Sequence, residues 1–96
     1  ERMIFGKSLN AGQICVAPDY VLLPRGQEQA FVEAYRDHFA RLYPQGLASA
    51  DYGSIINGRQ YERLTSWLAE AERAGAQIHP CGNPARDDGA AADRVL

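Results

Sequence analysis

Residues 6–20 have the sequence GKSLNAGQICVAPDY, in which one cysteine follows a corner of asparagine, alanine and glycine. Asparagine and glycine tolerate the left-handed backbone that ends many helices, so the corner predicts the end of a helix over residues 1–9. Gly12, three residues before Cys15, lacks side-chain bulk and lets the backbone approach a substrate closely. The stretch therefore predicts a loop between a helix and a strand, a common place for reacting groups on a rigid scaffold.

From the residues alone, Cys15 has two interpretations. A cysteine nucleophile needs exposure, surroundings that favour the thiolate, and a hydrogen-bond donor for the oxyanion that forms on attack. A lone cysteine is more often a small buried hydrophobic residue. Composition and spacing leave both interpretations open.

Two longer helices are expected after the loop. The first covers about residues 27–43, where apolar positions follow the 3.6-residue period, and Pro44 helps to end it. The second begins at Asn57, which together with Gln60 resembles a capping box, and it ends near Ala74. One face of this second helix is expected to carry its apolar residues: Tyr61, Leu64, Leu68 and Ala71, with Trp67 beside them.

Short runs between these helices predict strands. Residues 18–24 contain β-branched and aromatic side chains between two prolines and predict a short buried strand, and residues 76–79 resemble a second strand. Residues 81–94 predict a loop or a disordered stretch, and a further strand-like run begins at Val95. The order helix, strand, helix, helix, strand predicts an α/β fold with a parallel sheet.

Composition and charge argue against several classes of protein. The chain has 96 residues, one small domain at most, and its 46% hydrophobic and 23% charged residues predict a soluble globular protein. A net charge of −2 with scattered basic residues argues against a nucleic-acid partner. No apolar run approaches the roughly 18 residues of a membrane span. We therefore expect neither a nucleic-acid nor a membrane partner.

The remaining cysteine and histidines give no sign of a second site. Cys15 and Cys81 form no disulfide framework, and both are expected to be reduced in a cytoplasmic protein. His38 is expected to be a hydrogen-bonded structural residue on the first long helix. His79 lies near Cys81, but no further ligand completes a metal site, so no metal-binding residue is expected. A catalytic pair of Cys15 with either histidine has no local signature to support it.

The segment Gly12-Gln13-Ile14-Cys15-Val16-Ala17 resembles the active-site cysteine motif of the aldehyde dehydrogenase superfamily. The longer run 10–23 is similar to the class 3 branch and, more narrowly, to bacterial coniferyl aldehyde dehydrogenases. Residues 54–64 resemble a later segment of the same branch, so the resemblance covers the whole chain. Ser8 departs from the motif, which usually carries an aromatic or aliphatic residue there, and this bears on packing beneath the loop.

The resemblance implies a partial three-layer α/β catalytic domain, with helices packed on a mostly parallel sheet. Residues 1–96 would be a piece of that domain, truncated at both ends, with the nucleophile loop at about residues 10–18. Both ends of the chain lie at apolar segments, Met3-Ile4-Phe5 and Val95-Leu96, which also suggests an excerpt of a longer enzyme.

The resemblance further implies that Cys15 is the nucleophile and that its backbone N–H is a donor to the oxyanion. The parent enzyme would oxidise an aldehyde, such as an aromatic coniferyl-like one, to the acid through a thiohemiacetal and a thioester, with NAD or NADP as cofactor. The general base, the oxyanion asparagine and the cofactor-binding residues would lie outside residues 1–96. The isolated chain would therefore be inactive, with no cofactor bound.

Two other possibilities remain at this point. The chain could be a small non-catalytic α/β interaction module in which Cys15 is merely structural, or the parent could be an acylating relative that uses coenzyme A in place of water. For the dehydrogenase we expect a homodimeric parent. We expect the isolated chain to self-associate, because helical stripes that normally face the missing strands would be exposed.

Overall fold

The computed structural model describes residues 1–82 and Arg94. The predicted strand at Val95 and nearly all of the predicted loop after Gly82 lie outside these residues. The described elements, in chain order, are α1 (Arg2–Ser8), the 3₁₀ helix η1 (Leu9–Gly12), α2 (Glu28–Leu42), the 3₁₀ helix η2 (Gly46–Ala48) and α3 (Gly58–Arg73). All three predicted helices are therefore confirmed, with ends that differ from the predicted ones by only a few residues.

The ends of α3 show why a helix forms at these residues. The side chain of Asn57 accepts a hydrogen bond of 2.9 Å from the backbone N–H of Gln60, which satisfies one of the free donors of the first turn. At the other end Gly75 has a φ of +94°, its N–H donates to Glu72, and the next N–H donates to Ala71. These two bonds form a Schellman motif, so local sequence determines both ends.

The two predicted strands do not form. Residues 18–24 and 76–79 are irregular, and no strand occurs in the described part of the chain, residues 1–82 and 94. The two strand predictions are therefore not confirmed by the described residues. A strand exists only where its peptide groups pair with a neighbouring strand, and neither run has such a partner here. The described architecture is accordingly helical.

A small aromatic cluster joins α1 to the end of α2. Ile4, Phe39 and Tyr43 are between 3% and 8% exposed, and Tyr52 packs against them from the segment after η2. The rings of Tyr43 and Tyr52 meet edge to face with centroids 5.1 Å apart, and Phe39 lies 5.0 Å from Tyr43. Such aromatic pairs add to the free energy gained by burying their area.

Ser8, the residue that departs from the family motif, is buried beneath this cluster. The Tyr43 hydroxyl donates to Ser8 Oγ at 3.2 Å, and the Ser8 hydroxyl donates to the carbonyl of Ile4 at 2.8 Å. Both hydroxyls are therefore satisfied away from water, and α1 is tied to the last turn of α2. Ser8 therefore takes part in the packing of α1 against α2.

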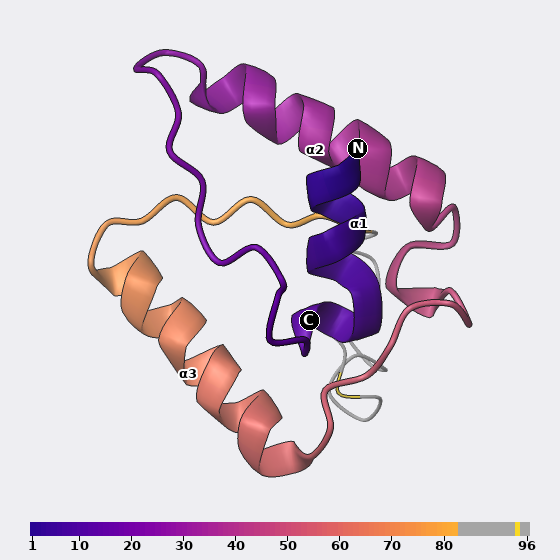
Figure 1. Ribbon diagram of the computed structural model, residues 1–96. Helices are drawn as coiled ribbons and strands as arrows, with labels where there is room; N and C mark the ends of the chain where they lie inside the picture. Colours follow the sequence, from indigo (N-terminus) through magenta and orange to yellow (C-terminus); the bar gives the residue numbers. More distant parts are fainter. Residues whose placement is uncertain (83–93, 95–96) are drawn as a thin grey trace.

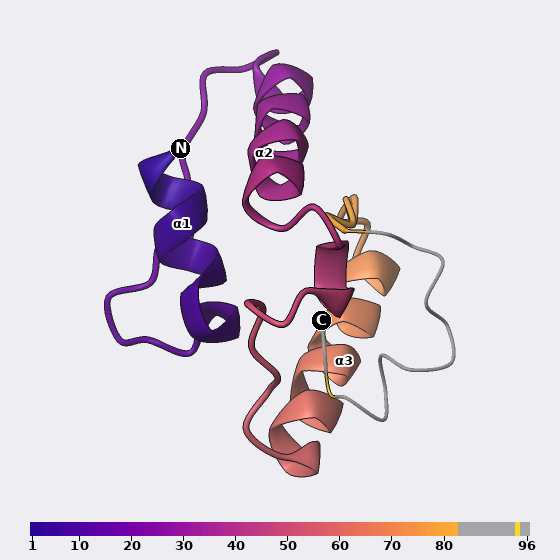
Figure 2. The same ribbon diagram turned by 90° about the vertical axis from the view of Figure 1, so that its right-hand side faces the viewer.

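The third helix is placed differently from the other two. Figure 1 shows α1 beneath α2, with α3 below and to the side, and in the turned view of Figure 2 α1 and α3 lie on opposite sides. No residue of α3 is buried, and Trp67 and Leu68 are 54% and 43% exposed. The apolar face predicted for this helix is thus only partly covered, because Tyr61, Leu64 and Ala71 are half-buried while Trp67 and Leu68 are exposed.

None of the helices in residues 1–82 is both long enough and apolar enough to traverse a lipid bilayer.

Candidate active-site loop

Cys15 lies at the corner of a hydrogen-bonded turn. The backbone N–H of Ala17 donates to the carbonyl of Ile14 at 2.9 Å, which closes a four-residue turn with Cys15 at its second position. The cysteine is exposed and forms no disulfide. Among residues 1–82 and 94, no acceptor receives its backbone N–H. The turn therefore leaves the Cys15 side chain exposed and its backbone N–H without an acceptor among these residues.

Before this turn the chain passes through a left-handed corner. Asn10, Ala11 and Gly12 have φ values of 51°, 53° and 75°. Two of them are not glycine, and this backbone costs such residues roughly 1–2 kcal/mol each. A Cβ at Gly12 would also lie 3.1 Å from the carbonyl oxygen of Lys7, closer than ordinary contact. The predicted corner is confirmed, and Gly12 is needed there for both conformation and space.

The side chain of Gln13 connects this corner to a distant part of the chain. Its Nε2 donates to the carbonyl of Ser54 at 3.0 Å and to that of Asn10 at 2.9 Å, while its Oε1 accepts the N–H of Ile56 at 2.9 Å. The backbones also approach closely here, because a Cβ on Gly53 would lie 3.4 Å from the Cα of Asn10. The loop that carries Cys15 therefore rests on residues 53–56.

Residues 53–56 are themselves held on their other side. Ile55 is 3% exposed, its N–H donates to the carbonyl of Arg94 at 2.8 Å, and Arg94 Nε donates to the carbonyl of Ile55 at 2.9 Å. The segment thus has hydrogen-bonded partners along both of its edges.

Cys81 lies apart from this loop and has different surroundings. It is half-buried against the aromatic cluster, and its thiol lies 3.6 Å from the carbonyl of His79. Burial raises the pKa of the Cys81 thiol more than the nearby Arg36 guanidinium lowers it. A raised pKa means less thiolate at neutral pH, so Cys81 is a poor nucleophile.

The structure brings no histidine into a cluster with Cys15. His38 Nδ1 lies 2.8 Å from the carbonyl of Ala34 one turn earlier in α2, which confirms a hydrogen-bonded structural histidine. In the part of the chain that the structure describes, no three His, Cys, Asp or Glu residues gather as metal ligands would.

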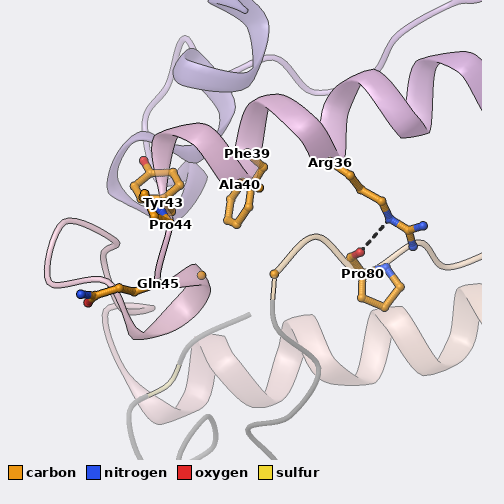
Figure 3. A pocket seen from close by; sticks show the side chains of 9 residues that line it. Arg36, Phe39, Ala40, Tyr43, Pro44, Gln45 and Pro80 are labelled. Atoms are coloured by element: carbon orange, nitrogen blue, oxygen red, sulfur yellow. Dashed lines mark hydrogen bonds between the residues drawn. The ribbon is translucent and has the colours of Figure 1, made fainter.

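Cys15 lines none of three hollows of about 320–470 Å³ among the described residues. One of about 470 Å³ lies between the end of α2 and residues 80–82, where Arg36 Nε donates to the carbonyl of Pro80 at 3.1 Å (Figure 3). Another, of about 320 Å³, is lined by residues of α1, by the chain after Pro18 and by Phe31 and Tyr35 of α2. Cys15 is therefore distinguished by its turn and its exposure, not by a cavity.

Gln13 is a further candidate for a functional role at this loop, and its contacts are not predictable from the neighbouring sequence. Its long side chain, with a donor and an acceptor, stands between Gly12 and Ile14 in a loop of otherwise small or apolar residues. This contrast in size and polarity is the sign in the sequence that Gln13 has a special role. Its partners lie 41 and 43 residues further along the chain, and only the folded structure reveals them.

The chain is similar to a known protein family and to several known enzymes. The model of the aldehyde dehydrogenase family, "Aldedh", matches residues 1–94. The chain is 48% identical over 80 residues, 83% of its length, to the "Probable coniferyl aldehyde dehydrogenase" of Pseudomonas aeruginosa. It is 42% identical over 88 residues, 92% of its length, to the coniferyl aldehyde dehydrogenase of a Pseudomonas species.

A mammalian relative is similar at a lower level. The "Aldehyde dehydrogenase, dimeric NADP-preferring" of Bos taurus is 38% identical over 68 residues, which is 70% of this chain and 28% of that protein. The matched region spans only 17% and 18% of the two Pseudomonas proteins. No solved structure matches the chain.

Proposed function

The chain belongs to the aldehyde dehydrogenase family, and on that premise we propose that Cys15 is the nucleophile of a full-length enzyme that oxidises an aldehyde to a carboxylic acid. The observation that carries the proposal is the exposed thiol of Cys15 at the corner of the Ile14–Ala17 turn, in a segment that resembles the family's cysteine motif. The alternative of a non-catalytic module with a structural cysteine fits this less well, because a structural cysteine is usually buried.

In the proposed reaction the Cys15 thiolate attacks the carbonyl carbon and forms a C–S bond, giving a tetrahedral thiohemiacetal. The backbone N–H of Cys15 donates to the oxyanion that develops. Loss of hydride from the adduct leaves a thioester on Cys15. Water then attacks the thioester carbonyl, the C–S bond breaks, and the acid leaves with the thiol regenerated.

A nicotinamide cofactor supplies the acceptor for that hydride. Residues 1–96 contain no G-x-G-x-x-G phosphate-binding turn, so we assign no cofactor contact to this chain. The bovine relative is named as NADP-preferring, so NADP as well as NAD is a candidate cofactor for the full-length protein. An aromatic aldehyde related to coniferyl aldehyde is the proposed substrate, on the strength of the two Pseudomonas relatives.

The remaining expectations concern the whole protein. We propose that residues 18–24 and 76–79 become strands of a mostly parallel sheet once neighbouring strands from the rest of the catalytic domain pair with them. We further propose that this protein is a cytoplasmic homodimer. The isolated chain is expected to be inactive and to self-associate through apolar faces such as that of α3.

The direct test replaces the sulfur in the full-length protein. Cys15→Ser should lower aldehyde-dependent NAD(P)H formation by at least about 10³-fold, because an un-ionised hydroxyl is a far weaker nucleophile than a thiolate. Cys81→Ser is the matched control, and it should retain activity close to that of the unmodified protein. Steady-state absorbance assays at 340 nm measure both. Normal turnover by Cys15→Ser would refute the proposed function.

A further inference from the structure

We propose that Gln13 is the positioning residue that sets where Cys15 stands, by pairing its side-chain amide with residues 54–56 as a neighbouring strand would. The proposal rests on the proposed function of Cys15, two residues further along the chain.

The hydrogen bonds of Gln13 fix the orientation of its amide. Nε2 faces two carbonyl oxygens, those of Ser54 and Asn10, and Oε1 faces the N–H of Ile56. Reversing the amide would turn an oxygen toward two oxygens and an NH₂ group toward an N–H, which would lose all three bonds. The side chain therefore has one satisfactory arrangement.

The pattern of these bonds matches that of a parallel β-pair. In such a pair, one residue donates its N–H to the carbonyl before its partner and accepts the N–H after it. Here the Gln13 amide does both around Ile55, with Ser54 on one side and Ile56 on the other. The N–H and C=O of Ile55 point the opposite way and bond to Arg94. Gln13 thus occupies one edge of an extended segment whose other edge is already filled.

The bonds of Gln13 affect the position of the Cys15 thiol. The chain before Cys15 has a left-handed backbone at three successive residues, and this conformation is unfavourable for Asn10 and Ala11. Gln13 bonds Asn10 and residues 54–56 at once, so it holds the corner closed and fixes the start of the Ile14–Ala17 turn. Without it, Cys15 keeps its chemistry but loses its fixed approach to the carbonyl carbon.

The test uses the full-length protein with Gln13→Ala, which removes all three bonds. We expect kcat to fall roughly 10–100-fold, the scale of a misplacement of about an ångström, while KM changes less than about threefold. Gln29→Ala is the matched control. Gln29 also makes an amide hydrogen bond, 2.9 Å to Glu33, but on the exposed surface of α2, so its kcat should not change.

Gln13→Glu adds a readout that a purely structural role would not change. A protonated carboxyl can donate to Ser54 and accept from Ile56, whereas the ionised form keeps only the acceptor and turns an oxygen toward two carbonyls. The ratio of its kcat to that of the unmodified protein should therefore rise as pH falls, and at low pH Gln13→Glu should exceed Gln13→Ala.

The outcomes are distinguishable. An unchanged kcat in Gln13→Ala, or an equal fall in Gln29→Ala, would overturn the positioning role. If Gln13→Ala does not fold, Gln13→Glu decides, and a kcat ratio that is flat with pH would overturn the proposal. Cys15→Ser, assayed alongside, separates the two ideas: its activity tests the nucleophile, whereas the Gln13 variants keep the thiol in place.

Discussion

The loop around Cys15 and helix α3 are stabilised by different kinds of interaction. The loop around Cys15 buries little, yet its corner is joined by Gln13 to residues more than 40 positions away. Helix α3 has a cap at Asn57 and a Schellman end at Gly75, but no buried residue. Directional long-range bonds thus fix the position of the loop. Helix α3 is instead formed by local interactions, and its apolar face is only partly covered.

The two regions need different things from the rest of the molecule. Hydrogen bonds of the loop need a small number of atoms at defined distances, and residues 53–56 supply them within this chain. An apolar helix face needs a large complementary surface, because hydrophobic stabilisation is proportional to the area removed from water. The described residues provide only part of that surface for α3.

The largest effect is expected on the apolar face of α3. If the rest of the catalytic domain covers this face, Leu68→Ala should destabilise the full-length protein by about 2–4 kcal/mol, since it leaves a cavity. Urea unfolding measures the change. Ser66→Ala, on the exposed side of the same helix, is the control and should change stability by less than about 0.5 kcal/mol. An equally small effect at Leu68 would mean that α3 stays on the surface.

A middle effect is expected at the corner of the loop. Gly12→Ala should cost about 1–2 kcal/mol, because a Cβ at φ +75° is strained and would press on the carbonyl of Lys7. Thermal unfolding of the full-length protein measures the loss, and kcat should fall with it because Cys15 lies three residues away. Gly26→Ala is a useful comparison. It has a similar φ of +84° but open space around it, so it shows the cost of conformation without the contact. Equal losses at both sites would remove the role given to the Lys7 contact.

The smallest effect is expected at the N-terminal cap of α3. Asn57→Ala removes the acceptor for the Gln60 N–H and should lower the free energy of unfolding by about 1 kcal/mol. Asn57→Ser keeps an acceptor and should recover most of the loss in the same urea titration. A loss of several kcal/mol would show that Asn57 contacts more than its own helix. The statement that α3 is formed by local interactions would then be wrong for its N-terminus.

Much of the molecule could be predicted because its causes lie close together in sequence. The corner at residues 10–12, the cap at Asn57 and the glycine after α3 act within a few residues, so each was recognisable from its sequence. The motif around Cys15 was recognisable in the same way, and the family match over residues 1–94 agrees with it. Local sequence could not decide whether residues 18–24 and 76–79 form strands, because a strand needs a partner strand that local sequence does not supply.

The amino-acid sequence by itself determined the three helices, their ends and the left-handed corner before Cys15, because helix hydrogen bonds and caps join residues only three to five positions apart. Only the tertiary structure decided that Ser8 would bond to Tyr43 and that Gln13 would pair with residues 54–56. Those contacts cross 35 to 43 residues of chain. Their partners are brought together by the packing of α1 on α2 and by the aromatic cluster, which no local pattern specifies.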